Sequence, residues 1–202
     1  MKNRAFTLSE VLITLGIIGV ISAITLPAVI NEFQHQHYLT ALKKAYSILQ
    51  QAENNIYVDY GMNSVFICNS NDSYCLVDIY KEYLKIGRIE KYIPNRNPEK
   101  CFGTIDVPHA DNKHACIFTT DGIIYDFDME NANTTMHNAY INIDINGLKG
   151  PNKYGKDRYM FQIRNNKVAP FYDNRSLCNN GKGSTDANLH CAYVYLTKNS
   201  AK

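Results

Sequence analysis

The chain lacks tryptophan and has no excess of charge of either sign. Its 202 residues include 15 tyrosines and no tryptophan, which favours a tyrosine-rich β surface over a deep indole-lined pocket. Lysine and arginine total 21 and aspartate and glutamate total 19, so the formal net charge is +2. A basic excess would suggest nucleic acid, and a long acidic block would suggest a disordered tail. The composition therefore excludes a basic nucleic-acid module, and we expect no nucleic-acid partner.

Catalytic signatures are missing as well. The sequence contains no Gly-x-Ser-x-Gly, no His-Glu-x-x-His and no phosphate-binding loop. A hydrophobic content of 45% is nevertheless enough to build a core, and the length suits one ordinary domain plus an extra element. The sequence therefore predicts a folded protein that is not an enzyme.

Charge is absent from residues 11–30, which read VLITLGIIGVISAITLPAVI. As a helix this run would cover about 30 Å, the thickness of the hydrocarbon core of a bilayer. Lys2 and Arg4 precede it, so the positive-inside rule keeps the N-terminus in the cytoplasm and sends the rest of the chain across. A cleaved secretory signal peptide and a plain signal anchor are alternatives, although the apolar part of a signal peptide normally has only about 7–15 residues.

Two residues of this region stand out. Glu10 lies at the edge of the run, where a carboxylate is costly unless it finds a partner. It either marks the membrane edge or pairs with a cation in an assembly. Pro27 lies inside the run and has no N–H, so we expect it to kink or locally melt the helix.

Residues 5–12, AFTLSEVL, followed by an apolar run with Pro27, resemble the N-terminal signature of type IV pilins and type II secretion pseudopilins. In that family a prepilin peptidase cuts on the cytoplasmic side, before a phenylalanine, and methylates the new N-terminus. The resemblance implies a cut between Ala5 and Phe6, with Phe6 as the methylated first residue. It also implies assembly roles for Glu10 and Pro27. The chain departs from the pattern at Ala5, where the family usually has glycine.

The resemblance implies a structural subunit of a type IV filament or a type II secretion pseudopilus. Its partners would be other pilin or pseudopilin subunits, the prepilin peptidase, the inner-membrane assembly platform and the lipid bilayer. Before assembly it would span the inner (cytoplasmic) membrane once, with a periplasmic or extracellular head. A minor tip subunit with an adhesin or ligand-binding head, and a membrane-anchored exported domain, are alternative interpretations.

The residues after the apolar run continue a helical pattern. Apolar residues recur there at steps of three or four residues, or their sums, and Gly61 is a good helix stop. They are Leu39, Leu42, Tyr46, Leu49, Ile56 and Tyr60. We expect one helix from about Phe6 to Tyr60. The predicted parts are a leader over 1–5, a membrane-spanning and polymerising half-helix over 6–30, an amphipathic half-helix over 31–61 and a globular head over 62–202.

The head combines a short helix with an antiparallel sheet. Helical spacing predicts a second helix over 76–86. After about Ala115 two apolar runs flank Asp121-Gly122, the favoured signal for a type I′ hairpin. Further strands are expected at 140–145, 159–164, 168–172 and 192–197, with a second hairpin between the middle two of these four. A helix followed by an antiparallel sheet gives an α+β, pilin-like fold.

Six cysteines all follow the apolar run, which favours disulfides formed in an oxidising compartment. Fifteen pairings are possible, and pairing of neighbours is the simplest. The resulting bridges would be Cys68–Cys75, Cys101–Cys116 and Cys178–Cys191, each closing a short loop. The last loop also resembles the disulfide-bounded variable loop near the C-terminus of many pilins.

A loop rich in aspartate, asparagine and glycine joins two predicted strands. Its oxygen-bearing side chains, Asp144, Asn146, Asn152 and Asp157, lie on a tightly turning backbone of the kind that Ca²⁺ uses. Some pseudopilins carry calcium in a head-domain loop, and this loop is similar in general character. The same residues also simply make turns, and nearby lysines argue against a cation. No cofactor is certain, and Ca²⁺ is an expectation.

Overall fold

The computed structural model describes residues 7–68, 73–91, 115–129, 139–164, 167–171, 178–179, 181–182 and 188–197. The chain divides into two compact units, Met1–His37 and Tyr38–Lys202. A single helix, α1 (Leu8–Tyr60), begins in the first unit and ends in the second. The predicted long N-terminal helix is therefore confirmed over its described length, and the two units are taken in turn.

The described part of the first unit is helix α1 with its side chains facing outward. Every described residue from Thr7 to Gln34 is exposed. Hydroxyl groups inside the apolar run are satisfied by the helix itself: Thr14 donates to the carbonyl of Val11 at 2.9 Å, and Thr25 to that of Ile21 at 3.0 Å. The helix continues through Pro27 without interruption, so of the two expected effects of Pro27 local melting is not observed in the single chain, and a kink stays a prediction.

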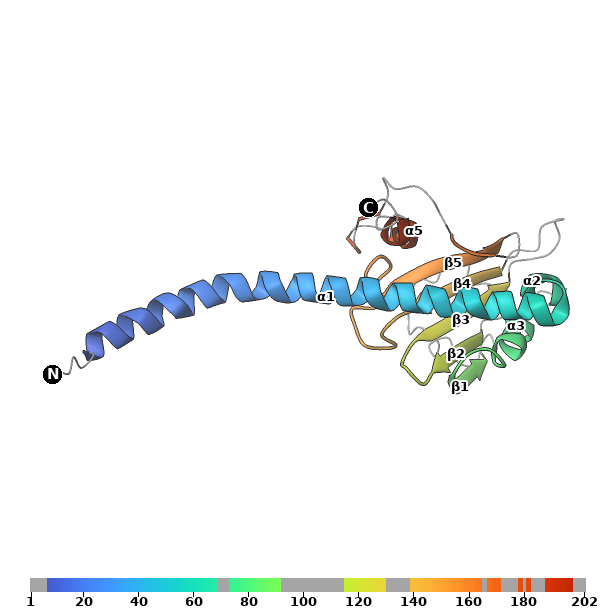
Figure 1. Ribbon diagram of the computed structural model, residues 1–202, viewed down its shortest axis with the longest axis horizontal. Coiled ribbons are helices and arrows are strands. Elements are labelled where there is room, and N and C mark those ends of the chain that lie inside the picture. The colour runs from blue at the N-terminus through green and yellow to red at the C-terminus, as the bar shows by residue number, and fades with distance from the viewer. Residues whose placement is uncertain are drawn as a thin grey trace, which may run out of the picture. The chain divides into compact units, whose positions relative to one another are not determined.

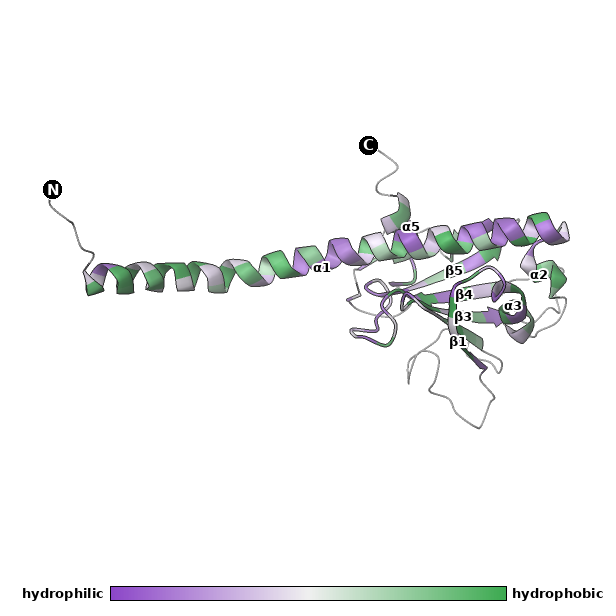
Figure 2. Ribbon diagram, turned by 60° about the horizontal axis from the view of Figure 1, so that its bottom comes forward, coloured by the Kyte–Doolittle hydropathy of each residue, from purple (hydrophilic) through white to green (hydrophobic). Residues whose placement is uncertain are grey.

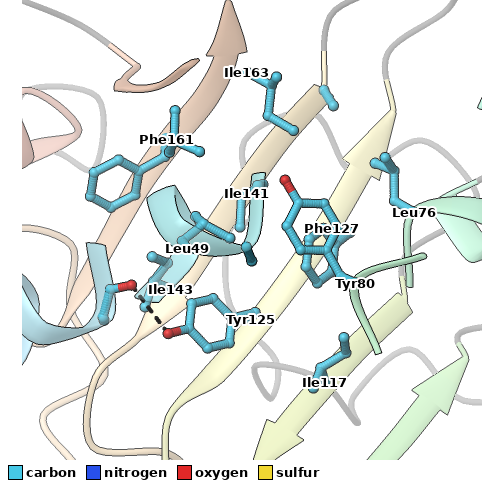
Figure 3. Close-up of a cluster of buried hydrophobic side chains, with 14 of the residues drawn as sticks. Leu49, Leu76, Tyr80, Ile117, Tyr125, Phe127, Ile141, Ile143, Phe161 and Ile163 are labelled. Atoms are coloured by element: carbon cyan, nitrogen blue, oxygen red, sulfur yellow. Dashed lines mark hydrogen bonds between the residues drawn. The ribbon is translucent and has the colours of Figure 1, made fainter. Parts of the chain in front are cut away.

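In the second unit, α1 packs on a sheet through one face. Leu42, Leu49 and Ile56, which recur every seven residues, are fully buried. Figure 3 shows Leu49 among side chains of the sheet such as Tyr125 and Ile143. Tyrosine hydroxyls also tie the helix down, since Tyr125 donates to the carbonyl of Ala45 at 3.2 Å. The amphipathic pattern predicted for this half of the helix therefore matches the packing of α1 on the sheet.

The sheet is an antiparallel meander in which every strand pairs with its neighbours in sequence. Helix α1 lies across it (Figure 1). The helix-facing residues of the central strands are apolar, whereas the opposite face carries buried polar groups. The strands are β1 (Ile86–Lys91), β2 (Ala115–Thr119), β3 (Ile124–Met129), β4 (Ala139–Asp144), β5 (Arg158–Arg164) and β6 (Lys167–Pro170). The predicted α+β architecture is confirmed.

The β2–β3 hairpin is confirmed, but its turn is not type I′. Thr119 donates its N–H to the carbonyl of Ile123 at 2.9 Å, which leaves a loop of three residues, 120–122. Gly122 has φ of +86°, while Asp121 does not have positive φ. A type I′ turn needs positive φ at both central residues, whereas a three-residue loop ends on one left-handed residue. The glycine of the Asp-Gly pair therefore fills the last loop position.

Two predicted elements need correction. The helix expected over 76–86 is α3 (Ser73–Tyr80), and the chain then turns and enters β1, where Gly87 lets a bulge approach β2. A Cβ on Gly87 would lie only 3.1 Å from the carbonyl oxygen of Phe118. The strand expected over 192–197 is instead helix α5 (Cys191–Thr197).

The mistake at α5 has a physical cause. Ala192, Val194 and Tyr195 are buried, and this spacing fits one face of a short helix as well as it fits an irregular strand. Short apolar segments do not distinguish the two by periodicity alone. Strand β1 and the four-residue helix α2 (Ser64–Ile67) were not predicted. Asn63 caps α2 by accepting the N–H of Phe66 at 3.0 Å.

The disulfides follow neighbour pairing wherever both partners are described. Cys68 bonds to Cys75, and Cys178 bonds to Cys191. Cys116 is also disulfide-bonded. Its predicted partner, Cys101, lies outside the described residues, so the third pairing stays a prediction.

Candidate functional site

The N-terminal end of α1 is organised by Thr7 and Glu10. Oε2 of Glu10 accepts both the backbone N–H and the hydroxyl of Thr7, each at 2.8 Å. The Thr7 hydroxyl oxygen in turn accepts the N–H of Glu10 at 3.3 Å. This reciprocal arrangement is a capping box, which satisfies donors that would otherwise be orphaned at a helix start.

The capping box identifies Thr7 as a functional residue that the sequence reasoning missed. Its signal was present, because Thr7 and Glu10 have the Thr-x-x-Glu spacing just before an apolar run. From the sequence, Glu10 was interpreted either as a mark of the membrane edge or as a partner for a cation in an assembly. In the single chain its carboxylate already has a local role as the helix cap.

The cap leaves half of the carboxylate available. Both bonds from Thr7 go to Oε2, and no bond to Oε1 is found within the described residues. Glu10 is exposed at the first turn of α1. A second donor can therefore approach Glu10 without breaking the cap. The residues predicted for processing, Ala5 and Phe6, lie outside the described residues and stay predictions.

After Glu10, α1 presents exposed apolar side chains that no other described part of the chain covers. Leu12, Ile18 and Ile24 are exposed by 61%, 59% and 72%. Such an apolar surface on a single chain marks a site for a membrane or a partner. By length and composition, this helix could cross a membrane. Pro27 lies within the same exposed stretch, and its role in assembly stays a prediction.

The comparison with known proteins bears on this same stretch. Residues 1–26 match the family described as the prokaryotic N-terminal methylation motif. The chain carries the signature of type IV pilins and pseudopilins. No curated protein and no solved structure matches it.

The motif supports a pilin-like or pseudopilin substrate of prepilin peptidase and points to a structural subunit rather than an enzyme. It also fits a precursor that is anchored in the membrane and assembles with other pilin subunits. Thr7 and Glu10 both lie inside the matched residues. The motif thus coincides with the capped, exposed start of α1.

In the pilin-like head, the loop expected to bind calcium is held by the protein's own donors. The Asp157 carboxylate accepts the backbone N–H groups of Asn152 and Lys153 at 2.8 and 2.7 Å. Asp144 accepts Nε of Arg158 at 2.8 Å. The side-chain amide of Asn146 donates to the carbonyl of Gly150 at 3.3 Å.

This bonding does not fit a calcium ion. Both carboxylates are engaged by N–H donors, and no group of three or more His, Cys, Asp or Glu side chains in the described part of the chain could hold a metal. The carbonyl oxygens of Asn146 and Asn152 are buried without a hydrogen-bond partner, but two neutral oxygens supply too few ligands for Ca²⁺. Calcium binding stays a prediction that would need the loop to rearrange.

The Asp144–Arg158 pair lies under the opposite face of the sheet from α1. Its side chains are exposed by 0% and 1%. Burial raises the pKa of Asp144 to about 7, and the neighbouring guanidinium of Arg158 opposes that rise. A buried ion pair adds little stability in itself, but loss of one partner leaves an uncompensated charge. We therefore expect removal of either partner alone to destabilise the head.

The C-terminal disulfide packs closely against the same loop. A Cβ on Gly155 would lie 2.8 Å from Sγ of Cys191, and Gly155 has φ of +81°. Tyr195 donates its hydroxyl to the carbonyl of Gly155 at 3.2 Å. Only glycine suits both the backbone conformation and the contact. The loop after β4 therefore packs against the Cys178–Cys191 disulfide and the start of α5.

Proposed function

We propose that the chain is a structural subunit of a type IV filament or a type II secretion pseudopilus. It is cleaved between Ala5 and Phe6 and polymerises through the N-terminal part of α1. The observation that carries the proposal is the methylation motif at the start of a helix whose residues from Thr7 to Gln34 are all exposed, the apolar ones included. A helix of this kind gains stability when neighbouring copies cover it.

The electrostatics of cleavage favour this function. Removal of residues 1–5 takes away Lys2 and Arg4, so the 21 basic residues fall to 19 and match the 19 acidic ones. It also creates a cationic amine on Phe6. Oε1 of Glu10 is free to accept that amine from a neighbouring subunit while Oε2 keeps the helix cap. Two poorly solvated, opposite charges then fix the axial register between subunits.

Small residues support close packing of the same helices. Gly16 and Gly19 have nothing within 4 Å of the position that a Cβ would take. Glycine on an apolar helix lets a second helix approach closely, and van der Waals packing drives helix association in lipid. Disulfides persist in oxidising compartments, so the two bridges support a head on the oxidising side of the membrane.

The test measures whether the protein is present in sheared filaments. The full chain is expressed in cells that build such filaments, with an active or an inactivated prepilin peptidase, and is detected by immunoblot in the filament and membrane fractions. We expect it in the filament fraction only when the peptidase is active. Retention in the membrane when the peptidase is active, while other subunits polymerise, would identify an anchored exported domain instead.

A further inference from the structure

Apolar side chains are exposed where α1 ends and α2 begins. Val58, Met62 and Phe66 are exposed by 78%, 46% and 56%. Helix α2 lies against the end of α1 in both views (Figures 1 and 2). We call these three residues the distal patch. Apolar groups that gather on the surface of a folded domain usually mark an interaction site.

The distal patch is held rigidly from beneath. Glu53, fully buried in α1, accepts the backbone N–H of Ser64 at 3.1 Å and the hydroxyl of Tyr80 at 2.5 Å. These bonds join α1 to the start of α2 and to α3. A surface that is already ordered loses little entropy when it docks.

A second apolar surface lies beside the β2–β3 turn. It is a groove of about 570 Å³ with Phe118, Ile123 and Leu148 among its lining and with Arg88 and Lys149 at its rim. Leu148 is exposed by 53%. The guanidinium of Arg88 lies 3.9 Å from the centroid of the Phe118 ring. We call this surface the basic-rimmed groove.

The distal patch and the basic-rimmed groove lie near different ends of the part of α1 that packs on the sheet. The β2–β3 turn that lines the groove is joined to α1 by the Lys44–Asp121 ion pair, with the atoms 2.6 Å apart. Tyr60, the last residue of α1, comes sixteen residues after Lys44. At 1.5 Å per residue this separation is about 24 Å.

Their charges are complementary. Asp59 adjoins Val58 in sequence, and it accepts the hydroxyl of Tyr83 at 2.6 Å. That hydrogen bond, together with burial and the nearby negative charges of Asp59 and Glu82, raises the pKa of Tyr83 to about 12. Glu82 adjoins Tyr83 in sequence, and both Asp59 and Glu82 are exposed. The groove is basic even though Glu90 bonds to Nε of Arg88 at 3.2 Å, since the guanidinium keeps further N–H donors.

We propose that the distal patch of one copy of this chain docks into the basic-rimmed groove of the next copy. The proposal rests on the polymerisation proposed above, which stacks identical heads in one orientation. Such stacking sets one end of a head against the opposite end of the next, in a heterologous contact that repeats along the filament. The apolar surfaces supply the contact, and Asp59 and Glu82 face the basic rim to select its register.

Cysteine cross-linking in assembled filaments tests the contact. The full chain is given Phe66→Cys and Leu148→Cys together, and filaments are sheared, mildly oxidised and analysed without reductant. Because none of the cysteines among the described residues is free, we expect new links to come from the added thiols. A repeating contact predicts a ladder of dimers, trimers and longer chains from the double variant. The single variants should stay monomeric on the same gel.

The outcomes separate this inference from the proposed function. Filaments that contain the double variant but give no ladder would overturn the docking and leave polymerisation intact. Dimers from either single variant would indicate a symmetric contact and would also overturn it. Absence of the unsubstituted chain from filaments would refute the proposed function first.

A charge exchange provides a second measurement that does not depend on disulfide geometry. Asp59→Lys and Arg88→Glu are each expected to lower the amount of the chain in filaments several-fold, because like charges then meet. The chain carrying both changes should recover, since the pair is restored with exchanged signs. A double variant no better than the worse single variant would contradict the contact.

Discussion

Replacing Glu10 with glutamine is expected to leave the protein processed and in the membrane but to remove it from filaments. Glutamine keeps the capping box with Thr7, because its side-chain oxygen still accepts the N–H and hydroxyl of that residue. It lacks the charge that pairs with the Phe6 amine. Loss of such a pair costs several kcal/mol, so we expect a fall of at least about tenfold in the ratio of filament to membrane protein.

Two further variants separate charge from capping. Glu10→Ala removes both and should behave like Glu10→Gln. Thr7→Val removes the hydroxyl of the cap but keeps the carboxylate, and it should assemble nearly normally. If Glu10→Gln formed filaments as efficiently as the unsubstituted chain does, while Glu10→Ala did not, Glu10 would act only by capping its own helix.

Replacing Arg158 with methionine is expected to destabilise the head strongly at neutral pH. The change leaves Asp144 buried without its neighbouring guanidinium. Removal of one partner of a buried pair costs about 3–5 kcal/mol. The midpoint of urea unfolding of the mature protein in detergent, followed by tyrosine signals with the disulfides intact, should fall accordingly.

The loss should depend on pH in a defined direction. The pKa of Asp144 in the folded chain is already raised from 3.8 to about 7, and without Arg158 it rises further. A raised pKa in the folded state means that stability is complete below the unfolded value and is lost as pH rises through the folded value. The deficit of Arg158→Met relative to the unsubstituted chain should therefore be larger at pH 8 than at pH 5.

A double variant gives the matched control. Asp144→Asn together with Arg158→Met removes both charges, so most of the lost stability should return and the added pH dependence should disappear. A deficit of Arg158→Met that stays the same from pH 5 to pH 8, or that the double variant does not reduce, would show that Arg158 acts through its packing rather than through Asp144.

The long N-terminal helix could be predicted because its signals are local and strong. An uncharged run, a helical repeat at Leu42, Leu49 and Ile56, and a glycine stop at Gly61 all agree with the structure. The strands of the two hairpins could likewise be predicted from the alternation of apolar and polar residues and from the turn residues between them. Pairing of the Cys68 and Cys178 bridges followed from short loops alone.

Other features depend on contacts that sequence spacing does not encode. Helix α5 is a helix although its short apolar pattern also suits a strand, and Gly87 serves a bulge against β2 rather than a helix end. The Asp144–Arg158 pair could not be predicted, because the two residues lie opposite each other on neighbouring strands and the sequence does not give the register of those strands. The same pairing explains why one carboxylate of the loop that looks suited to calcium, Asp144, is engaged by Arg158.

The most direct measurement is the N-terminal peptide of protein taken from sheared filaments, read by mass spectrometry. If the apolar start of α1 is exposed for polymerisation by prepilin peptidase, the peptide should begin at Phe6 and carry a methyl group on its amine. A peptide that still begins at Met1, or one that begins at Ala23 or Ile24 after ordinary signal cleavage, would contradict the account.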